Sequence, residues 1–150
     1  MNSVSFKTKF GWVSAFEEGN KIVRVKFGKN NNKSVSKILK KFKTSMNNFL
    51  NKKNHKITCN FHIEGNIIQK KVWRELTKIK LGKTKSYGEI ASKFNLSPRH
   101  VGKICSQNKI VLIIPCHRVV RSDGSMGGFT SVGGISLKKK LLDFERLWKQ

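Results

Sequence analysis

The segment IIPCHRVV, residues 113–120, carries the most distinctive chemistry of this chain. An apolar run from Ile110 to Ile114, mostly β-branched, leads into it and predicts a short buried strand or extended segment. Pro115 lacks a backbone N–H and favours an extended conformation at the residue before it, so we expect regular pairing to end there. A thiol, an imidazole and a guanidinium follow in consecutive positions. The pattern places a cysteine and two polar neighbours at the end of a core segment.

Two interpretations of Cys116 are open. A free cysteine is most often a buried core residue. The alternative is a nucleophile, because the thiolate is the attacking species and nearby cationic groups lower the pKa of a thiol. His117 and Arg118 directly after the cysteine favour the nucleophile. Neighbouring residues of an extended segment point to opposite faces, so His117 would need a turn or a bridging water to reach the sulfur.

Residues 114–120, IPCHRVV, resemble the active-site signature of the methylated-DNA–protein-cysteine methyltransferases. Members of that family move an alkyl group from the oxygen of a damaged guanine onto their own cysteine. The motif is long and specific, and matching features extend over residues 67–145, whereas residues 1–66 match only in general layout. The resemblance implies that Cys116 is the alkyl acceptor.

The composition is strongly basic. Among 150 residues, 32 Lys and Arg face eight Asp and Glu, which gives a net charge of +24. Such a charge attracts polyanions and speeds encounter with nucleic acid. Lys and Asn are both abundant, so part of the excess is compositional. A role at a membrane surface is disfavoured, because no segment combines basic charge with a broad apolar face and aromatic anchors.

The cysteine content also indicates a compartment. The chain has three cysteines, Cys59, Cys105 and Cys116. An odd number without dense spacing disfavours a disulfide scaffold and favours a reducing, intracellular setting. We therefore expect a cytoplasmic protein, or a nuclear one if the source is a eukaryote. No run is long enough to span a bilayer, and no N-terminal export signal is expected.

The predicted fold class is α+β, with a small antiparallel sheet and a helix followed by a mostly helical part. Alternating apolar residues over 3–28 predict a β-meander, and residues 57–61 a fourth short strand. Apolar residues at helical spacing predict a helix over 35–50. We expect a supporting N-terminal domain, 1–65, and a C-terminal domain, 66–150, that carries the chemistry.

His55, Cys59 and His62 form a candidate zinc site, since imidazole and thiolate are zinc ligands. A fourth ligand is missing, and the strand-like segment would not direct three side chains to one point. The motif has a high false-positive risk, so we expect no metal.

The C-terminal domain contains three helix-start signals, each a capping residue and its partner: Asn66 with Gln69, Ser86 with Glu89, and Ser97 with Pro98. The last two open short helices joined by a tight turn, with the small Ala91 where the helices cross. This pattern predicts a helix-turn-helix, and its alternative is an αα-hairpin without a ligand. Arg99, His100 and Lys103 on the exposed face of the second helix favour DNA.

The resemblance sharpens this region. Similar proteins place the second helix in the minor groove and turn the target nucleotide out of the base stack, as base-modifying enzymes must. The match implies that Arg99 fills the gap left in the duplex, and the alternative for Arg99 is a phosphate contact. It also implies that Tyr87 helps to rotate the DNA backbone, and the alternative for Tyr87 is a packing residue in the first turn of its helix. The family typically has alanine where His100 stands. Further expected DNA-binding residues are Ser97, Lys103 and Arg118.

The resemblance also implies the rest of the site. Asn108, eight residues before the nucleophile, is expected to tie the helix end to the active-site segment; the alternative is an ordinary helix C-terminal residue. Cys105 is expected to form a pocket wall or part of the core, and not a second nucleophile. Phe129 replaces the family's tyrosine, which keeps an aromatic wall but removes a hydroxyl that would bond a guanine ring nitrogen. The remaining expected pocket residues are Met126, Thr130 and Ser131, the last two as donors to the guanine oxygen.

A last helix is predicted from Ser136 onward. Residues 141–145, LLDFE, fit the family pattern Leu-Leu-x-x-Glu, in which the glutamate orients the active-site histidine. The match implies that Glu145 holds His117; the alternative is a surface ion pair of little energetic value. Arg146 replaces the family's glycine, so we expect the helix to continue.

The expected function is single-turnover DNA repair. Cys116, with His117 as base and Glu145 behind it, would take the alkyl group of O6-alkylguanine in double-stranded DNA, and alkylated thymine is a further candidate substrate. We expect no cofactor and no obligate protein partner, and binding to DNA as a monomer. Two other classes stay open: a non-catalytic lesion-recognition protein of the same fold, whose known examples lack the cysteine, and a Cys-His hydrolase, which would turn over its substrate.

Overall fold

Three strands form an antiparallel sheet at the start of the chain in the computed structural model, which describes residues 1–129 and 133–148. In sheet order they are β1 (Asn2–Thr8), β2 (Gly11–Glu18) and β3 (Lys21–Phe27). The register sets apolar side chains in two rows on one face: Val4, Ala15 and Val25, then Phe6, Val13 and Phe27. The predicted meander is confirmed.

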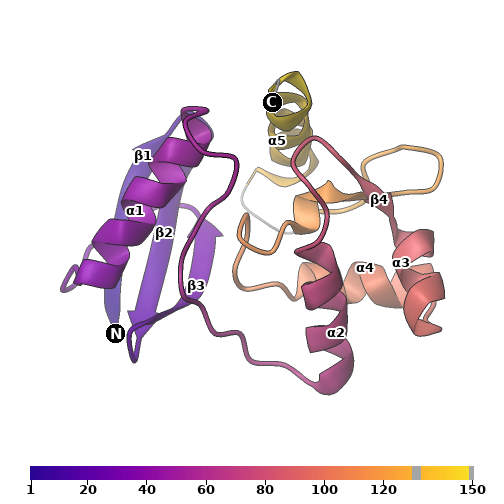
Figure 1. Cartoon of the computed structure of the whole chain (residues 1–150), viewed down its shortest axis with the longest axis horizontal. Coiled ribbons are helices and arrows are strands. Elements are labelled where there is room, and N and C mark those ends of the chain that lie inside the picture. The colour runs from indigo at the N-terminus through magenta and orange to yellow at the C-terminus, as the bar shows by residue number, and fades with distance from the viewer. Residues whose placement is uncertain (130–132, 149–150) are drawn as a thin grey trace. The chain divides into compact units, whose positions relative to one another are not determined.

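Helix α1 (Lys37–Leu50) covers the apolar face of this sheet (Figure 1). Ser36 caps it, because its hydroxyl accepts a hydrogen bond from the Leu39 N–H at 3.3 Å. The rings of Phe6 and Phe42 meet edge to face, with centroids 6.3 Å apart. The buried side of the helix is built from Leu39, Phe42, Met46, Phe49 and Leu50. The opposite side is left to lysine and polar residues.

Two predicted extended segments do not become strands. The segment 57–61 makes only a single parallel bridge, between Phe61 and Ile22. In the segment 110–114, Ile110 bridges Val25, and the chain then turns at Leu112, whose φ is +72°. A left-handed conformation is rare for a bulky side chain and is incompatible with continued strand pairing.

Contacts divide the chain into two units: the first is Met1–Glu64 with Lys109–Ile113, and the second is Gly65–Asn108 with the chain from Ile114 onward. The short segment belongs to the first unit because the Val25 N–H donates to the Lys109 carbonyl at 2.9 Å and the Val111 N–H donates to the Val25 carbonyl at 3.3 Å. The predicted domains, 1–65 and 66–150, had assigned this segment to the second.

The second unit is mostly helical. The elements of this unit are α2 (Ile67–Leu76), β4 (Lys85–Ser86), α3 (Tyr87–Phe94), α4 (Pro98–Ser106), the 3-10 turn η1 (Cys116–Arg118), β5 (Val119–Val120) and α5 (Gly134–Leu147). Together the two units confirm the predicted α+β class. Strands β4 and β5 pair in parallel, which holds the start of α3 beside the residues that follow η1.

The capping signals of the sequence are realised. Asn66 and Gln69 exchange side-chain and backbone hydrogen bonds at the start of α2, and Ser86 and Glu89 do the same at α3. Helix α3 ends at Asn95 in a left-handed conformation, φ 56°, which lets the chain reverse into α4. The two helices form the predicted helix-turn-helix.

Helix α5 begins at Gly134, two residues before the predicted start at Ser136. The residue before the helix, Gly133, has a φ of +98°, and a Cβ there would lie 2.9 Å from the Leu137 side chain, so only glycine fits. The helix continues through Arg146, as predicted. None of the described helices is both long enough and apolar enough to cross a membrane.

Candidate active site

The turn η1 presents Cys116. The Cys116 N–H donates to the Ile114 carbonyl at 2.8 Å and the Arg118 N–H donates to the Pro115 carbonyl at 2.9 Å, so the chain is tightly coiled here and not extended. This turn changes the directions that an extended segment would give to neighbouring side chains. The Cys116 residue is 6% exposed.

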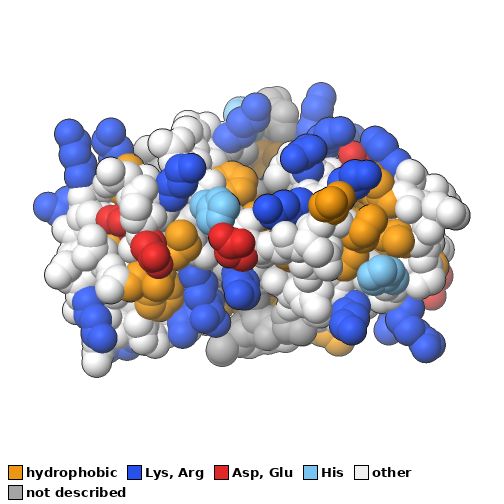
Figure 2. Space-filling model, turned by 90° about the horizontal axis from the view of Figure 1, so that it is seen from below, with side chains coloured by type: hydrophobic (Ala, Val, Ile, Leu, Met, Phe, Trp, Pro, Cys, Tyr) orange, Lys and Arg blue, Asp and Glu red, His pale blue; other side chains and the backbone are white. Residues whose placement is uncertain are grey.

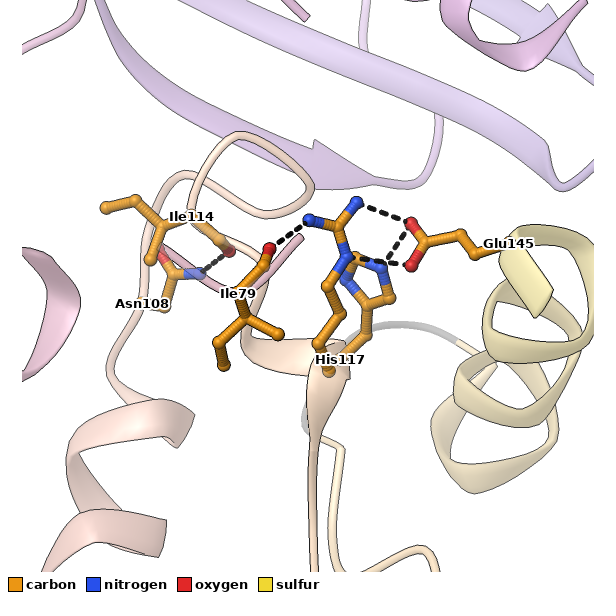
Figure 3. A network of polar contacts seen from close by, with 6 residues as sticks. Ile79, Asn108, Ile114, His117 and Glu145 are labelled. Carbon is orange, nitrogen blue, oxygen red and sulfur yellow. Dashed lines mark hydrogen bonds and ion pairs between the residues drawn. The ribbon is translucent and has the colours of Figure 1, made fainter. Parts of the chain in front are cut away.

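The carboxylate of Glu145 is the centre of a buried polar cluster in the second unit. Its Oε2 lies 2.8 Å from Nε2 of His117, and both residues are 1% exposed. Figure 3 shows the Glu145 side chain reaching from α5 toward the imidazole of His117. Burial raises the pKa of Glu145, but the charges and hydrogen bonds of His117 and Arg118 outweigh it and lower the pKa to about 2. Glu145 is therefore an anion at neutral pH.

Arg118 belongs to the same cluster, which corrects its expected role as a DNA-binding residue. Its Nε donates to Glu145 Oε1 at 2.7 Å, its Nη2 to Glu145 Oε2 at 2.9 Å, and its Nη1 to the Ile79 carbonyl at 2.7 Å. A guanidinium that is 9% exposed and held at three nitrogens cannot reach a phosphate. The sequence could not distinguish this arrangement from an exposed arginine, because all three partners are distant in the chain.

Asn108 lies beside the cysteine segment. Its side-chain Nδ2 donates to the Ile114 carbonyl at 2.8 Å, which ties the end of α4 to the residues just before η1 (Figure 3). Burial raises the pKa of the Cys116 thiol, while a hydrogen bond from Asn108 and the charge of Lys138 oppose that effect. The thiol is therefore mostly protonated at neutral pH and needs a base before it can attack.

Lys138 is a buried residue that the sequence reasoning missed. Its Nζ donates to the Tyr87 hydroxyl at 3.2 Å and to the Gly128 carbonyl at 3.3 Å, and it lies 5.5 Å from the centre of the Tyr87 ring. Burial lowers the pKa of Lys138, and the thiols of Cys116 and Cys105 raise it when ionised. The sequence spacing could have indicated this burial, because Lys138 lies two helical turns before Glu145 and therefore on the same face of the helix.

Tyr87 is half-buried between two glycines. A Cβ on Gly102 would lie 3.8 Å from the ring, and a Cβ on Gly127, whose φ is +67°, would lie 2.8 Å from it. The backbone at Gly127 therefore packs directly against Tyr87. Burial, followed by the nearby thiols Cys105 and Cys116, raises the pKa of Tyr87 to about 12, so the phenol keeps its proton.

The structure describes only three of the five expected pocket residues. Cys105 is buried, and burial, with a smaller effect of Cys116, raises its pKa to about 12, which makes it an unreactive thiol. Met126 and Phe129 are half-buried in the loop before α5. Thr130 and Ser131 lie outside the described residues.

The predicted DNA-binding residues of α4 lie on its solvent side. The Ser97 hydroxyl accepts a hydrogen bond from the His100 N–H at 3.1 Å and so caps the helix. Arg99, His100 and Lys103 are exposed. Within residues 1–129 and 133–148, neither Arg99 nor Lys103 forms an ion pair with a carboxylate, so both charges are available to an external anion.

The candidate zinc ligands do not assemble. Across the part of the chain that the structure describes, no group of three or more His, Cys, Asp or Glu side chains is arranged to hold a metal ion. His62 instead contacts Glu64, with Nε2 and Oε1 2.6 Å apart. Burial raises the pKa of Cys59 to about 11.

Several known proteins are similar to this chain in sequence. A methylated-DNA–protein-cysteine methyltransferase of Methanocaldococcus vulcanius is 52% identical over 81 residues, which cover 54% of this chain and 48% of the relative. The Metallosphaera sedula protein of the same name is 34% identical over 144 residues, covering 94% of this chain and 90% of the relative.

Two solved structures have the same fold. The Mycobacterium tuberculosis OGT crystallised with DNA has a TM-score of 0.86 at 24% identity, over 97% of this chain and 93% of that one. An O6-methylguanine DNA methyltransferase of Methanococcus jannaschii has a TM-score of 0.71 at 30% identity, over 96% and 93%. Residues 67–147 match the family profile described as the DNA binding domain of 6-O-methylguanine DNA methyltransferase. The chain belongs to the family of methylated-DNA–protein-cysteine methyltransferases.

Proposed function

We propose that this protein repairs DNA by moving one alkyl group from O6-alkylguanine to the sulfur of Cys116. The observation that carries the proposal is the contact of 2.8 Å between Glu145 of α5 and His117. His117 lies in the turn η1, directly after Cys116. A buried thiol with a raised pKa needs a base, and a buried imidazole backed by a carboxylate is a base that is held in one orientation.

In the proposed reaction His117 takes the proton of Cys116, directly or through a water, and the charge of Glu145 stabilises the imidazolium that forms. The sulfur then attacks the alkyl carbon. A carbon–sulfur bond forms as the carbon–oxygen bond to guanine breaks, and the electron pair leaves with the guanine oxygen. The guanine anion takes up a proton to give the neutral base, and the imidazolium of His117 releases one, so the proton count balances. The products are guanine in DNA and a thioether, which is not cleaved under cellular conditions. Each protein molecule therefore acts once.

DNA binding is assigned to the helix-turn-helix. Arg99 and Lys103 on α4 are exposed cations, and Tyr87 opens α3 beside them in the same motif. Lys and Arg side chains are spread over the face drawn in Figure 2, where acidic side chains form only small patches. A net charge of +24 provides the attraction for a duplex. We infer that Arg99 occupies the space of a nucleotide turned out of the stack.

The proposal is tested by weighing the intact protein after incubation with a duplex that carries O6-methylguanine. A gain of one methyl group per molecule is expected, and the Cys116→Ala variant should gain none. Damaged duplex that binds without any gain in mass would favour the non-catalytic, lesion-recognition alternative. Product in molar excess over protein would favour a hydrolase.

A further inference from the structure

The exposed side of α1, in the first unit, borders a surface groove of about 420 Å³. The groove lies between this helix and the segment that follows it, which is held by a hydrogen bond of 2.8 Å from the Thr58 N–H to the Ser45 hydroxyl. The residues that line it are Lys37, Lys40, Lys41, Thr44, Ser45, Asn48, Asn54 and Thr58.

The chemistry of this lining is one-sided. Three of the eight residues are cations and five are neutral and polar, and none is a carboxylate or an apolar residue. Among the described residues, no ion pair involves Lys37, Lys40 or Lys41. Three uncompensated positive charges around polar side chains are complementary to an anion that brings several oxygens.

The lysines also occupy the less favourable end of the helix. Cations are disfavoured near a helix N-terminus, where the unpaired N–H groups make the local potential positive. The first turn of α1 contains no acidic residue to offset this, and the last turn contains no basic one. The cationic arrangement therefore does not serve the stability of the helix, and an external anion would relieve the repulsion.

We propose that this groove binds the phosphodiester backbone of a nucleic acid, as a contact separate from the helix-turn-helix. Lys37, Lys40 and Lys41 lie close together, within about 6 Å along the helix axis at 1.5 Å per residue. The neutral polar residues Thr44, Ser45 and Asn48 continue the lining to about 16 Å from Lys37. One strand of B-form DNA rises about 3.4 Å per phosphate, so a groove of this length extends beyond a single phosphate ion. The inference does not depend on alkyl transfer.

The test uses the full chain and an undamaged, fluorescently labelled duplex of about 20 base pairs. The groove variant K37Q/K40Q/K41Q is compared with the control K7Q/K9Q/K21Q, which removes the same charge from exposed lysines on β1, the following turn and β3. Each phosphate contact adds about 0.9 to the slope of log affinity against log salt. We expect the groove variant to flatten that slope by about two to three and the control by less than one. Equal slopes for the two variants would overturn the proposal.

A second measurement does not rely on substitutions. Acetylation of surface lysines by a reagent, followed by peptide mass mapping, reports which amines the duplex protects. Lys37, Lys40 and Lys41 should be protected by the duplex, and not by inorganic phosphate at the same phosphate concentration, whereas Lys7 and Lys21 should react equally with and without DNA. Absence of protection, or equal protection by inorganic phosphate, would contradict a nucleic-acid groove. Methyl transfer from free O6-methylguanine base to Cys116 should be the same in both variants, which separates this inference from the proposed function.

Discussion

The buried cluster around Glu145 and the exposed lysines of α1 use the same kinds of charge in opposite ways. In the cluster, one carboxylate contacts two cationic or ionisable groups, and both of its oxygens are engaged. Along α1, three cations line a groove without a carboxylate. A buried charge must be paired to be tolerated, whereas an exposed charge costs little and is free to act on a partner. The comparison indicates that the first region fixes geometry, whereas the charges of the second are open to an external anion.

The largest expected effect comes from removing the carboxylate at the centre of the cluster. Glu145→Gln leaves Arg118 buried without its counter-charge, so we expect a loss of about 3–5 kcal/mol in the free energy of unfolding and loss of methyl transfer. Urea denaturation measures the first. The matched control is Asp143→Asn on the same helix, which breaks an exposed pair with Arg146 and should cost less than about 1 kcal/mol. Equal losses of unfolding free energy in the two variants would contradict the claim that burial makes the Glu145–Arg118 pair more important for stability than the exposed pair.

The same carboxylate predicts how stability depends on pH. The pKa of Glu145 is about 2 in the folded protein, below the 4.5 that is ordinary for a glutamate. A lowered pKa contributes stability that is fully present above the unfolded value and is lost as the pH falls from about 4.5 to 2, because the unfolded chain takes up the proton first. The contribution should be up to about 3 kcal/mol. Unfolding free energies measured from pH 6 to pH 2.5 should fall less steeply in Glu145→Gln, and an unchanged slope would contradict the assignment.

Lys138 is a smaller test. It is buried, and no carboxylate within residues 1–129 and 133–148 forms an ion pair with it. Its charge lowers the raised pKa of Cys116, so Lys138→Met should make the thiolate scarcer. We expect Cys116 to react with iodoacetamide several-fold more slowly at pH 8, because a smaller fraction of the thiol is ionised. In both proteins the rate should increase as the pH rises, with the variant's profile displaced to higher pH. A profile that keeps its position would assign Lys138 a packing role only.

The smallest effect on stability is expected at α4. Lys103→Gln removes an exposed cation, so the unfolding free energy should change by less than about 0.5 kcal/mol. The slope of log DNA affinity against log salt should fall by about one. Lys80→Gln, at another exposed lysine of the same unit, is the control and should leave the slope nearly unchanged. An equal change of the slope in both variants would contradict the claim that α4 contacts the DNA phosphates and that Lys80 does not.

Local signals predicted most of the fold. The capping pairs at Asn66 and Ser86 were readable because their partners are three residues away, and Ser97 was readable because Pro98 follows it directly. The helices begin where these signals predict. The segment 110–114 was harder, because only tertiary contact with β3 and the turn at Leu112 decide that it forms a bridge and no strand.

The site shows the same division between local and distant information. The sequence indicated Cys116, His117 and Glu145 through a family resemblance, and the structure brings the last two into contact across 28 positions. It did not indicate that Arg118 turns inward, because its partners Ile79 and Glu145 are far away in the chain. The sequence patterns did not single out Lys138, although its helical phase places it on the buried face.

The central claim is that the turn η1 and its buried base select one of three cysteines for alkyl transfer. The most direct test incubates the protein with a duplex containing O6-methylguanine labelled in its methyl group and then maps the label by peptide mass spectrometry. Label on Cys116 alone, at no more than one methyl per molecule, is the predicted result. Label on Cys59 or Cys105, or none on Cys116 while the duplex is bound, would contradict it.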